Sequence, residues 1–189
     1  MNGICPYFTM FPLEFPYRVL RQHAGSGGKV LDPFCGRGTS LYAARMLGMP
    51  AYGIDSNPVA VAISRAKLAN ATPTAIVAAA QRILNEPSSV TCPDGEFWRL
   101  AYAPKVLESL CRLRSALLDD ASSAARQSLV GIILGALHGP MPKSAPSYFS
   151  NQCTRTFAPK PAYAVRFWNE RRLLPPEVDV LELIKQRAE

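Results

Sequence analysis

Two short segments of the chain carry residue types whose spacing could hold a small molecule. The first covers residues 32–39 with the sequence DPFCGRGT, and the second covers residues 53–58 with the sequence GIDSNP. Gly36 and Gly38 allow the backbone to approach a ligand closely, and amide groups at a helix start favour a carboxylate or a phosphate. Asp55 lies nineteen residues after Gly36, a spacing at which an acid commonly binds ribose hydroxyls. Together the two segments predict a nucleoside-binding site.

The glycine spacing favours a nucleoside without phosphates over a dinucleotide. A dinucleotide loop follows the pattern G-x-G-x-x-G, whereas Ser40 and Leu41 stand where that pattern would end in glycine. S-adenosylmethionine is a nucleoside of the favoured kind. Two simpler interpretations stay open, in which the glycines form a plain turn and Asp55 only caps the next helix.

Alternating strands and helices are expected to position these segments. Residues 29–32 and 51–55 are short apolar stretches that each end on an acid, which predicts two strands. Helical spacing follows at residues 15–22, 39–47 and 58–70, the last with an Asn-Pro start. The order strand, helix, strand, helix predicts a parallel sheet with helical crossovers, which is an α/β fold.

The rest of the chain predicts a different architecture. No strand is expected after residue 70, and residues 139–161 are expected to form a proline-rich loop. We therefore expect residues 1–70 to form the ligand-binding part, and residues 71–189 to form a helical, proline-rich region of the same domain or an insertion. The helices expected in this second part cover residues 74–84, 104–118, 122–137, 162–171 and 176–187.

The first segment resembles the D-P-F-x-G-x-G-T motif of DNA methyltransferases that make N4-methylcytosine or N6-methyladenine. Residues 11–16, FPLEFP, resemble the H-P-x-x-F-P element of this family with Phe11 in place of His, and residues 53–55 resemble its ribose-binding motif. Residues 137–161 also resemble a subgroup of these enzymes. The resemblance implies a Rossmann-like methyltransferase βαβ core, incomplete in this chain and followed by a helical region, that binds S-adenosylmethionine.

By this resemblance, the loop after the first strand surrounds the methionine part of the cofactor and Asp55 binds the ribose. Cys35 would lie against the cofactor instead of acting as a nucleophile. Plain packing beneath the loop is the alternative for Phe34 and Cys35. The implied cofactor-binding residues are Pro12, Phe15, Asp32, Phe34, Cys35, Gly36, Gly38, Thr39, Asp55, Ser56 and Asn57.

The catalytic motif of this family is not found, so the catalytic residues stay unassigned. The family places Ser, Asp or Asn before Pro-Pro and an aromatic residue, which bind the target amine and stack on the flipped base. In this chain Pro175-Pro176 is followed by Glu177, and residues 145–148, APSY, lack the oxygen acceptor and the second proline. The Pro-Cys pair typical of carbon methylation is also missing, because only Cys5-Pro6 and Cys92-Pro93 occur.

We therefore expect the cofactor-binding part of a longer or split DNA methyltransferase, with the catalytic half on a second polypeptide in the split case. One alternative is a non-catalytic remnant that binds DNA or a subunit. Another is a fragment of an RNA or small-molecule methyltransferase, because the cofactor half is widely shared.

A basic and aromatic stretch at residues 143–172 is the expected DNA-binding surface. Cations bind phosphates and aromatic rings stack on bases; in the other interpretation these rings form the core of the helical region. The candidate nucleic-acid-binding residues are Lys143, Arg155, Lys160 and Arg166, interleaved with Tyr148, Phe149, Phe157, Tyr163, Phe167 and Trp168.

Composition bounds the class of protein. With 48% apolar and 19% charged residues the chain is not expected to be disordered, and the net charge of +7 fits a polyanion partner. No apolar run reaches membrane-spanning length, so no membrane partner is expected. The five cysteines show no C-x-x-C pair, which argues against a zinc site and a disulfide framework and favours a reduced, cytoplasmic protein.

Overall fold

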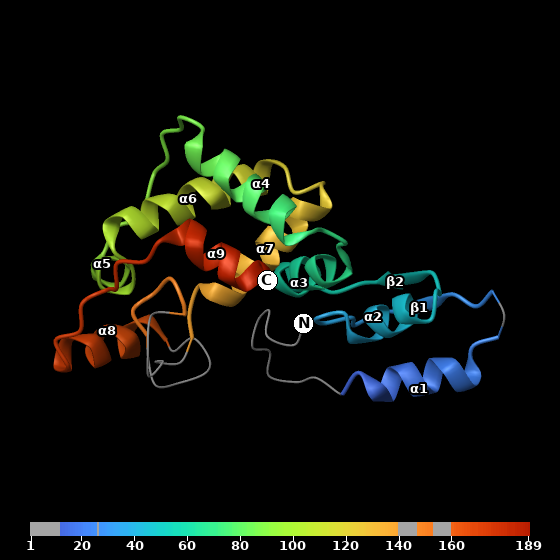
Figure 1. Cartoon of the computed structure of the whole chain (residues 1–189). Helices are drawn as coiled ribbons and strands as arrows, with labels where there is room; N and C mark the ends of the chain where they lie inside the picture. Colours follow the sequence, from blue (N-terminus) through green and yellow to red (C-terminus); the bar gives the residue numbers. More distant parts are fainter. Residues whose placement is uncertain (1–11, 26, 140–146, 153–159) are drawn as a thin grey trace.

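The protein is described from a computed structural model, which covers residues 12–25, 27–139, 147–152 and 160–189. Figure 1 shows a small strand-containing part beside a larger group of helices. We call residues 30–68 the βαβ unit and residues 73–188 the helical region.

The βαβ unit is built on two short parallel strands. Strands β1 (Val30–Asp32) and β2 (Ala51–Gly53) pair with Leu31 opposite Tyr52. Helix α2 (Thr39–Met46) connects them and covers one face of the pair. This packing is close, because a Cβ atom at Gly53 would lie 2.5 Å from Leu41 Cδ1. Helix α1 (Glu14–His23) lies against α2.

Helix α3 (Pro58–Leu68) belongs to the βαβ unit and also contacts the helical region. Its start matches the sequence expectation, since the Asn57 side chain accepts a hydrogen bond from Val59 N and Pro58 is the first helical residue. One side of α3 contacts α2 and another contacts α7 (Ala124–Ala136). Both α3 and α7 bury small residues, among them Ala60 and Gly131, and small residues let two helices approach closely.

The helical region holds the larger hydrophobic core. Helix α4 (Pro73–Asn85) contacts α6 (Pro104–Asp119), α7 and α9 (Val180–Ala188), whereas α5 (Glu96–Ala101) contacts α8 (Pro161–Glu170). The largest side chains with almost no exposure are Trp168, Phe149, Ile63, Leu113 and Leu129. All but Ile63 belong to the core of the helical region.

The parallel strand–helix–strand–helix order is confirmed, and the described residues are otherwise mostly helical. The two strands are compatible with part of an α/β fold. The Rossmann-like character of this incomplete core remains an expectation.

Two details of the helical prediction are wrong. Helix α9 begins at Val180 and not at residue 176, because the Asp179 side chain accepts a hydrogen bond from Glu182 N at 2.9 Å and so caps the helix from outside it. The six-residue helix α5 was not expected. It is short and aromatic, and its Phe97 and Trp98 pack with Trp168 and Tyr102 respectively, so tertiary contacts hold a segment without a long helical pattern.

Candidate functional site

Asp55 connects the two loops that follow the strands. Its Oδ2 accepts a hydrogen bond from Gly36 N at 2.8 Å, and its Oδ1 accepts one from Asn57 N at 2.8 Å. The loop after β1 is also tied to the end of β2, since Cys35 N donates to Ile54 O at 2.9 Å. The two segments singled out in the sequence therefore meet at the carboxyl ends of the parallel strands, where α/β folds bind ligands.

Two glycines give the loop its shape. Gly36 and Gly38 have φ values of 50° and 71°, in the left-handed region that favours glycine. Ser64 of α3 holds this turn, because its Oγ donates to Gly36 O at 2.8 Å. A Cβ atom at Gly38 would lie only 2.7 Å from that same Oγ, so the loop lies directly on α3.

The loop leads into the N-terminus of α2. Thr39 is the first residue of this helix, and Gly38 precedes it in the left-handed conformation without a side-chain hydrogen bond to the first turn. The first amide groups of a helix are strong, unpaired donors. The sequence predicts an anionic or polar ligand group at this helix start.

Phe34 and Cys35 lie on opposite sides of the loop. Phe34 is 87% exposed, and its amide donates to Asp32 Oδ1 at 3.0 Å, so packing beneath the loop is wrong for this residue. Cys35 is buried, and burial raises the pKa of its thiol. A thiol held in its protonated form is a poor nucleophile, which agrees with the expected non-nucleophilic role.

The other expected cofactor residues are less tightly grouped. Ser56 and Asn57 are exposed beside Asp55 at the end of β2. Pro12 and Phe15 lie at the start of α1, where Phe15 N donates to Pro12 O and the Phe15 ring is 51% exposed. Phe11, the residue in place of the family's His, lies outside the described residues.

Three residues of this site were missed in the sequence. Ser64 supports the loop, and Arg37 and Lys67 are buried cations with 4% and 5% exposure. Burial and the neighbouring Arg37 guanidinium lower the pKa of Lys67 to about 8. A helical lysine normally lies in solvent, so only the packing of α3 against the loop could show this pair.

The expected nucleic-acid surface is only partly described. Lys160 is exposed at the start of α8, and the Arg166 side chain is 70% exposed on the same helix. Lys143 and Arg155, together with Phe157, lie outside the described residues. The stacking interpretation is wrong for three of the rings, because they belong to the hydrophobic core: Phe149, Phe167 and Trp168.

The two segments that partly resemble the catalytic motif lie outside the loops around Asp55. Residues 145 and 146 of the APSY segment lie outside the described residues, and Pro175-Pro176 precedes the cap of α9. Within the described residues no group of His, Cys, Asp and Glu is arranged to hold a metal ion. Nor does any helix among them have the length and apolar character needed to cross a membrane.

Comparison with known proteins finds matches over the N-terminal third of the chain. Residues 2–66 match the family model described as DNA methylase. The Type II methyltransferase M.MjaII of Methanocaldococcus jannaschii is 34% identical over 68 residues, which are 36% of this chain and 13% of that protein. No solved structure matches the chain. Over residues 2–66 the chain is therefore similar to DNA methylases, which confirms the resemblance that its motifs predict.

Proposed function

We propose that this chain is the cofactor-binding part of an S-adenosylmethionine-dependent DNA methyltransferase that modifies an exocyclic amino group of cytosine or adenine. The observation that carries the proposal is the hydrogen bond between Asp55 and Gly36. It joins the two family motifs into one site at the ends of the parallel strands. The methylase match over the same residues supports it.

The residues present fit a nucleoside with an amino-acid tail. The Asp55 carboxylate accepts two backbone hydrogen bonds, and about four lone-pair sites are available on a carboxylate. The remaining sites suit two neighbouring ribose hydroxyls. The exposed Phe34 ring and the uncapped start of α2 offer an apolar and a polar surface on the same loop.

When bound, S-adenosylmethionine supplies a methyl group that the target amine attacks in line, so positioning contributes most of the catalysis. The part assigned to this chain is to hold and orient the cofactor with residues 32–39 and Asp55. No role in accepting hydrogen bonds from the amine is assigned to its residues. We therefore propose that the target base is held by another polypeptide or by another part of a longer chain.

Calorimetric titration with S-adenosylmethionine tests cofactor binding. Asp55→Asn is expected to weaken binding at least tenfold, because the amide group removes the charge and replaces one of the two oxygen acceptors with an NH2 donor that faces a backbone N–H. Glu177→Gln is the matched control, since Glu177 is exposed and lies away from the loop in the sequence. Absence of binding by the folded wild-type chain, or equal affinities for all three proteins, contradicts the proposal.

A companion polypeptide is supported by the uncovered face of the strand pair. Leu31, Tyr52 and Ile54 are 66%, 62% and 60% exposed, and Leu31 and Tyr52 are paired across the strands. Two strands alone are marginally stable in water, so further strands or a cover are expected. Methyl transfer to duplex DNA should appear when a polypeptide with an acceptor-Pro-Pro-aromatic motif is added.

The same mixing experiment separates the enzyme from its non-catalytic alternative. Binding of S-adenosylmethionine without methyl transfer, with every companion that carries that motif, would favour the remnant that binds DNA or a subunit.

For DNA contact, Arg166→Ala should weaken duplex binding about equally for all sequences and reduce its salt dependence. Arg99→Ala is the control, at a cation of similar exposure that forms an ion pair with Asp94. It should leave duplex binding and its salt dependence unchanged.

A further inference from the structure

Cys92 and Cys111 bring two thiols together in the helical region, outside the proposed cofactor loop. Cys92 lies in the irregular segment between α4 and α5, and Cys111 lies on α6. A hydrogen bond joins the two side chains. Each is a free, half-buried thiol, so a small molecule in solution can reach the pair.

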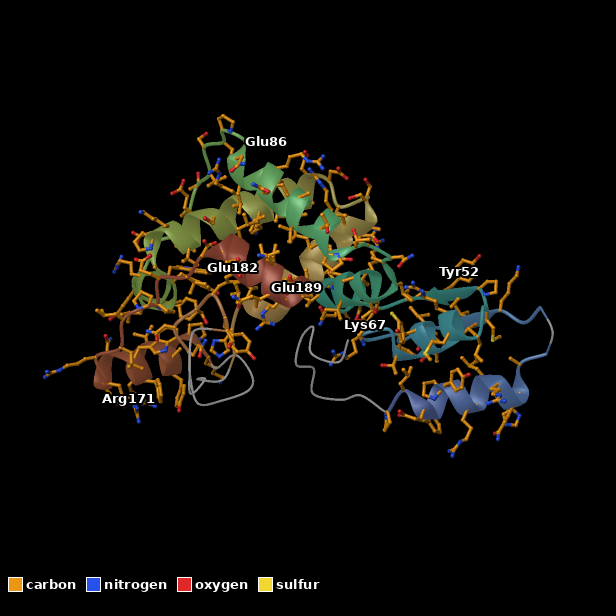
Figure 2. All side chains as sticks on the ribbon, in the orientation of Figure 1. Tyr52, Lys67, Glu86, Arg171, Glu182 and Glu189 are labelled. Atoms are coloured by element: carbon orange, nitrogen blue, oxygen red, sulfur yellow. The ribbon has the colours of Figure 1, made fainter. Side chains whose placement is uncertain are left out.

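The segment that carries Cys92 is fastened to α6 by the residue next to Cys111. Arg112 donates from its Nε to Ser88 Oγ at 3.1 Å, and its guanidinium also donates to Glu86 O. Figure 2 shows Glu86 at the edge of the helical region, apart from the βαβ unit. Residues 87–94 form no helix or strand, so a short movement that joins the two sulfur atoms breaks no regular structure.

We propose that Cys92 and Cys111 form a reversible disulfide, with a low-molecular-weight disulfide such as oxidised glutathione as the oxidant. The Cys92 thiolate attacks one sulfur atom of the oxidant, forms a mixed disulfide and releases a glutathione thiolate, which takes up a proton. Cys111 then loses its proton to solvent and attacks the Cys92 sulfur atom. This step forms the protein disulfide and releases the second glutathione. Two electrons pass from the cysteine pair to the oxidant, which leaves as two thiols.

The order of the two steps follows from the surroundings of Cys111. Burial and the hydrogen bond with Cys92 raise the pKa of Cys111 to about 11, so at neutral pH its side chain is a thiol and Cys92 reacts first. The disulfide closes a stretch of chain that contains α5, whose Phe97 packs on Trp168. Oxidation is therefore expected to stabilise the helical region, whereas in a reducing compartment the pair rests as two thiols.

Peptide mapping of the folded chain in glutathione buffers tests the pair. The peptides that contain Cys92 and Cys111 should be joined after oxidation and separated again by dithiothreitol. Oxidation should also raise the midpoint of thermal unfolding by roughly 5 °C or more. Cys111→Ser should trap glutathione on Cys92, because no second thiol resolves the mixed disulfide. Cys92→Ser should leave Cys111 reduced at pH 7.

Two further variants test whether the fold brings the thiols together. Arg112→Gln should lower the joined fraction at a given ratio of oxidised to reduced glutathione, because it frees the segment from α6. Lys105→Gln, at an exposed lysine of the same helix, is the matched control and should leave that fraction unchanged.

The proposal is overturned if the two peptides stay separate at every glutathione ratio. It is also overturned if oxidation joins either cysteine to a different cysteine of the chain, or if the joined fraction is the same in the folded chain and in urea. In the last case the pairing would come from random encounters and not from the contact on α6.

Discussion

Replacing Lys67 with Met should stabilise the unliganded chain. The pKa of Lys67 falls from 10.5 to about 8 through burial and the Arg37 charge. At pH 7 this difference corresponds to about 3 kcal/mol of destabilisation, at 1.36 kcal/mol per pKa unit. Methionine keeps an unbranched stem and removes the charge, and no hydrogen bond to a described residue is lost. We therefore expect the free energy of unfolding to rise by about 1–3 kcal/mol.

Urea unfolding at pH 7 and pH 10, followed by circular dichroism, measures this effect. The folded-state pKa of Lys67 lies below its unfolded value, so between pH 8 and 10.5 the unfolded state binds more protons and wild-type stability rises with pH. The advantage of Lys67→Met should therefore shrink to about 1 kcal/mol or less at pH 10. Lys105→Met should change stability by less than about 0.5 kcal/mol at either pH.

A destabilised Lys67→Met variant would refute this reasoning. So would a gain that stays constant between pH 7 and 10, because the stabilisation would then come from packing and not from removal of a buried charge.

Three further predictions concern packing and stability. Gly38→Ala should lower the free energy of unfolding by more than about 2 kcal/mol, because its Cβ would clash with Ser64 Oγ in addition to the strain of a left-handed backbone. Gly48→Ala is the control, since Gly48 also has a left-handed φ of 68° but has open space around it, and it should cost about 1 kcal/mol in the same urea unfolding assay. Asp179→Ala should cost about 1 kcal/mol by removing the cap of α9, and equal loss in an exposed control such as Glu177→Ala would contradict this. Trp168→Ala should lower the free energy of unfolding by about 3–5 kcal/mol, because it removes a large buried ring. A variant that stays stable but binds DNA less well would contradict the core assignment and place Trp168 on the nucleic-acid surface.

The sequence predicts the local parts of the site well. The nineteen-residue spacing between Gly36 and Asp55 anticipates a contact that the structure shows at 2.8 Å, because the strand–helix–strand order leaves few arrangements for the two loops. Helices with strong caps, such as α3 and α4, also begin within one residue of expectation.

What the sequence does not predict depends on how elements face one another. Lys67 in a helix is normally a solvent-exposed cation, and only the hydrogen bond of Ser64 to the loop shows which face of α3 is covered. From the sequence alone the rings of Phe149 and Trp168 could stack on bases, but in the structure they are buried in the core of the helical region. Helix α5 is similar, since its Phe97 packs on Trp168, an aromatic partner distant in the sequence.

The position of α3 has a consequence for how this protein can be divided. Residue 70 is the boundary expected from the sequence, yet α3 ends at Leu68 and packs on α7, which begins at Ala124. Cutting the chain at that boundary would strip a covering helix from α7 and leave apolar surface on both pieces. We expect the two pieces to be poorly soluble when made separately and to recover when produced together. Helix α3 supports the cofactor loop on one side and packs on the helical region on the other. A substitution on either side of α3 is therefore expected to affect the structure on the other side as well.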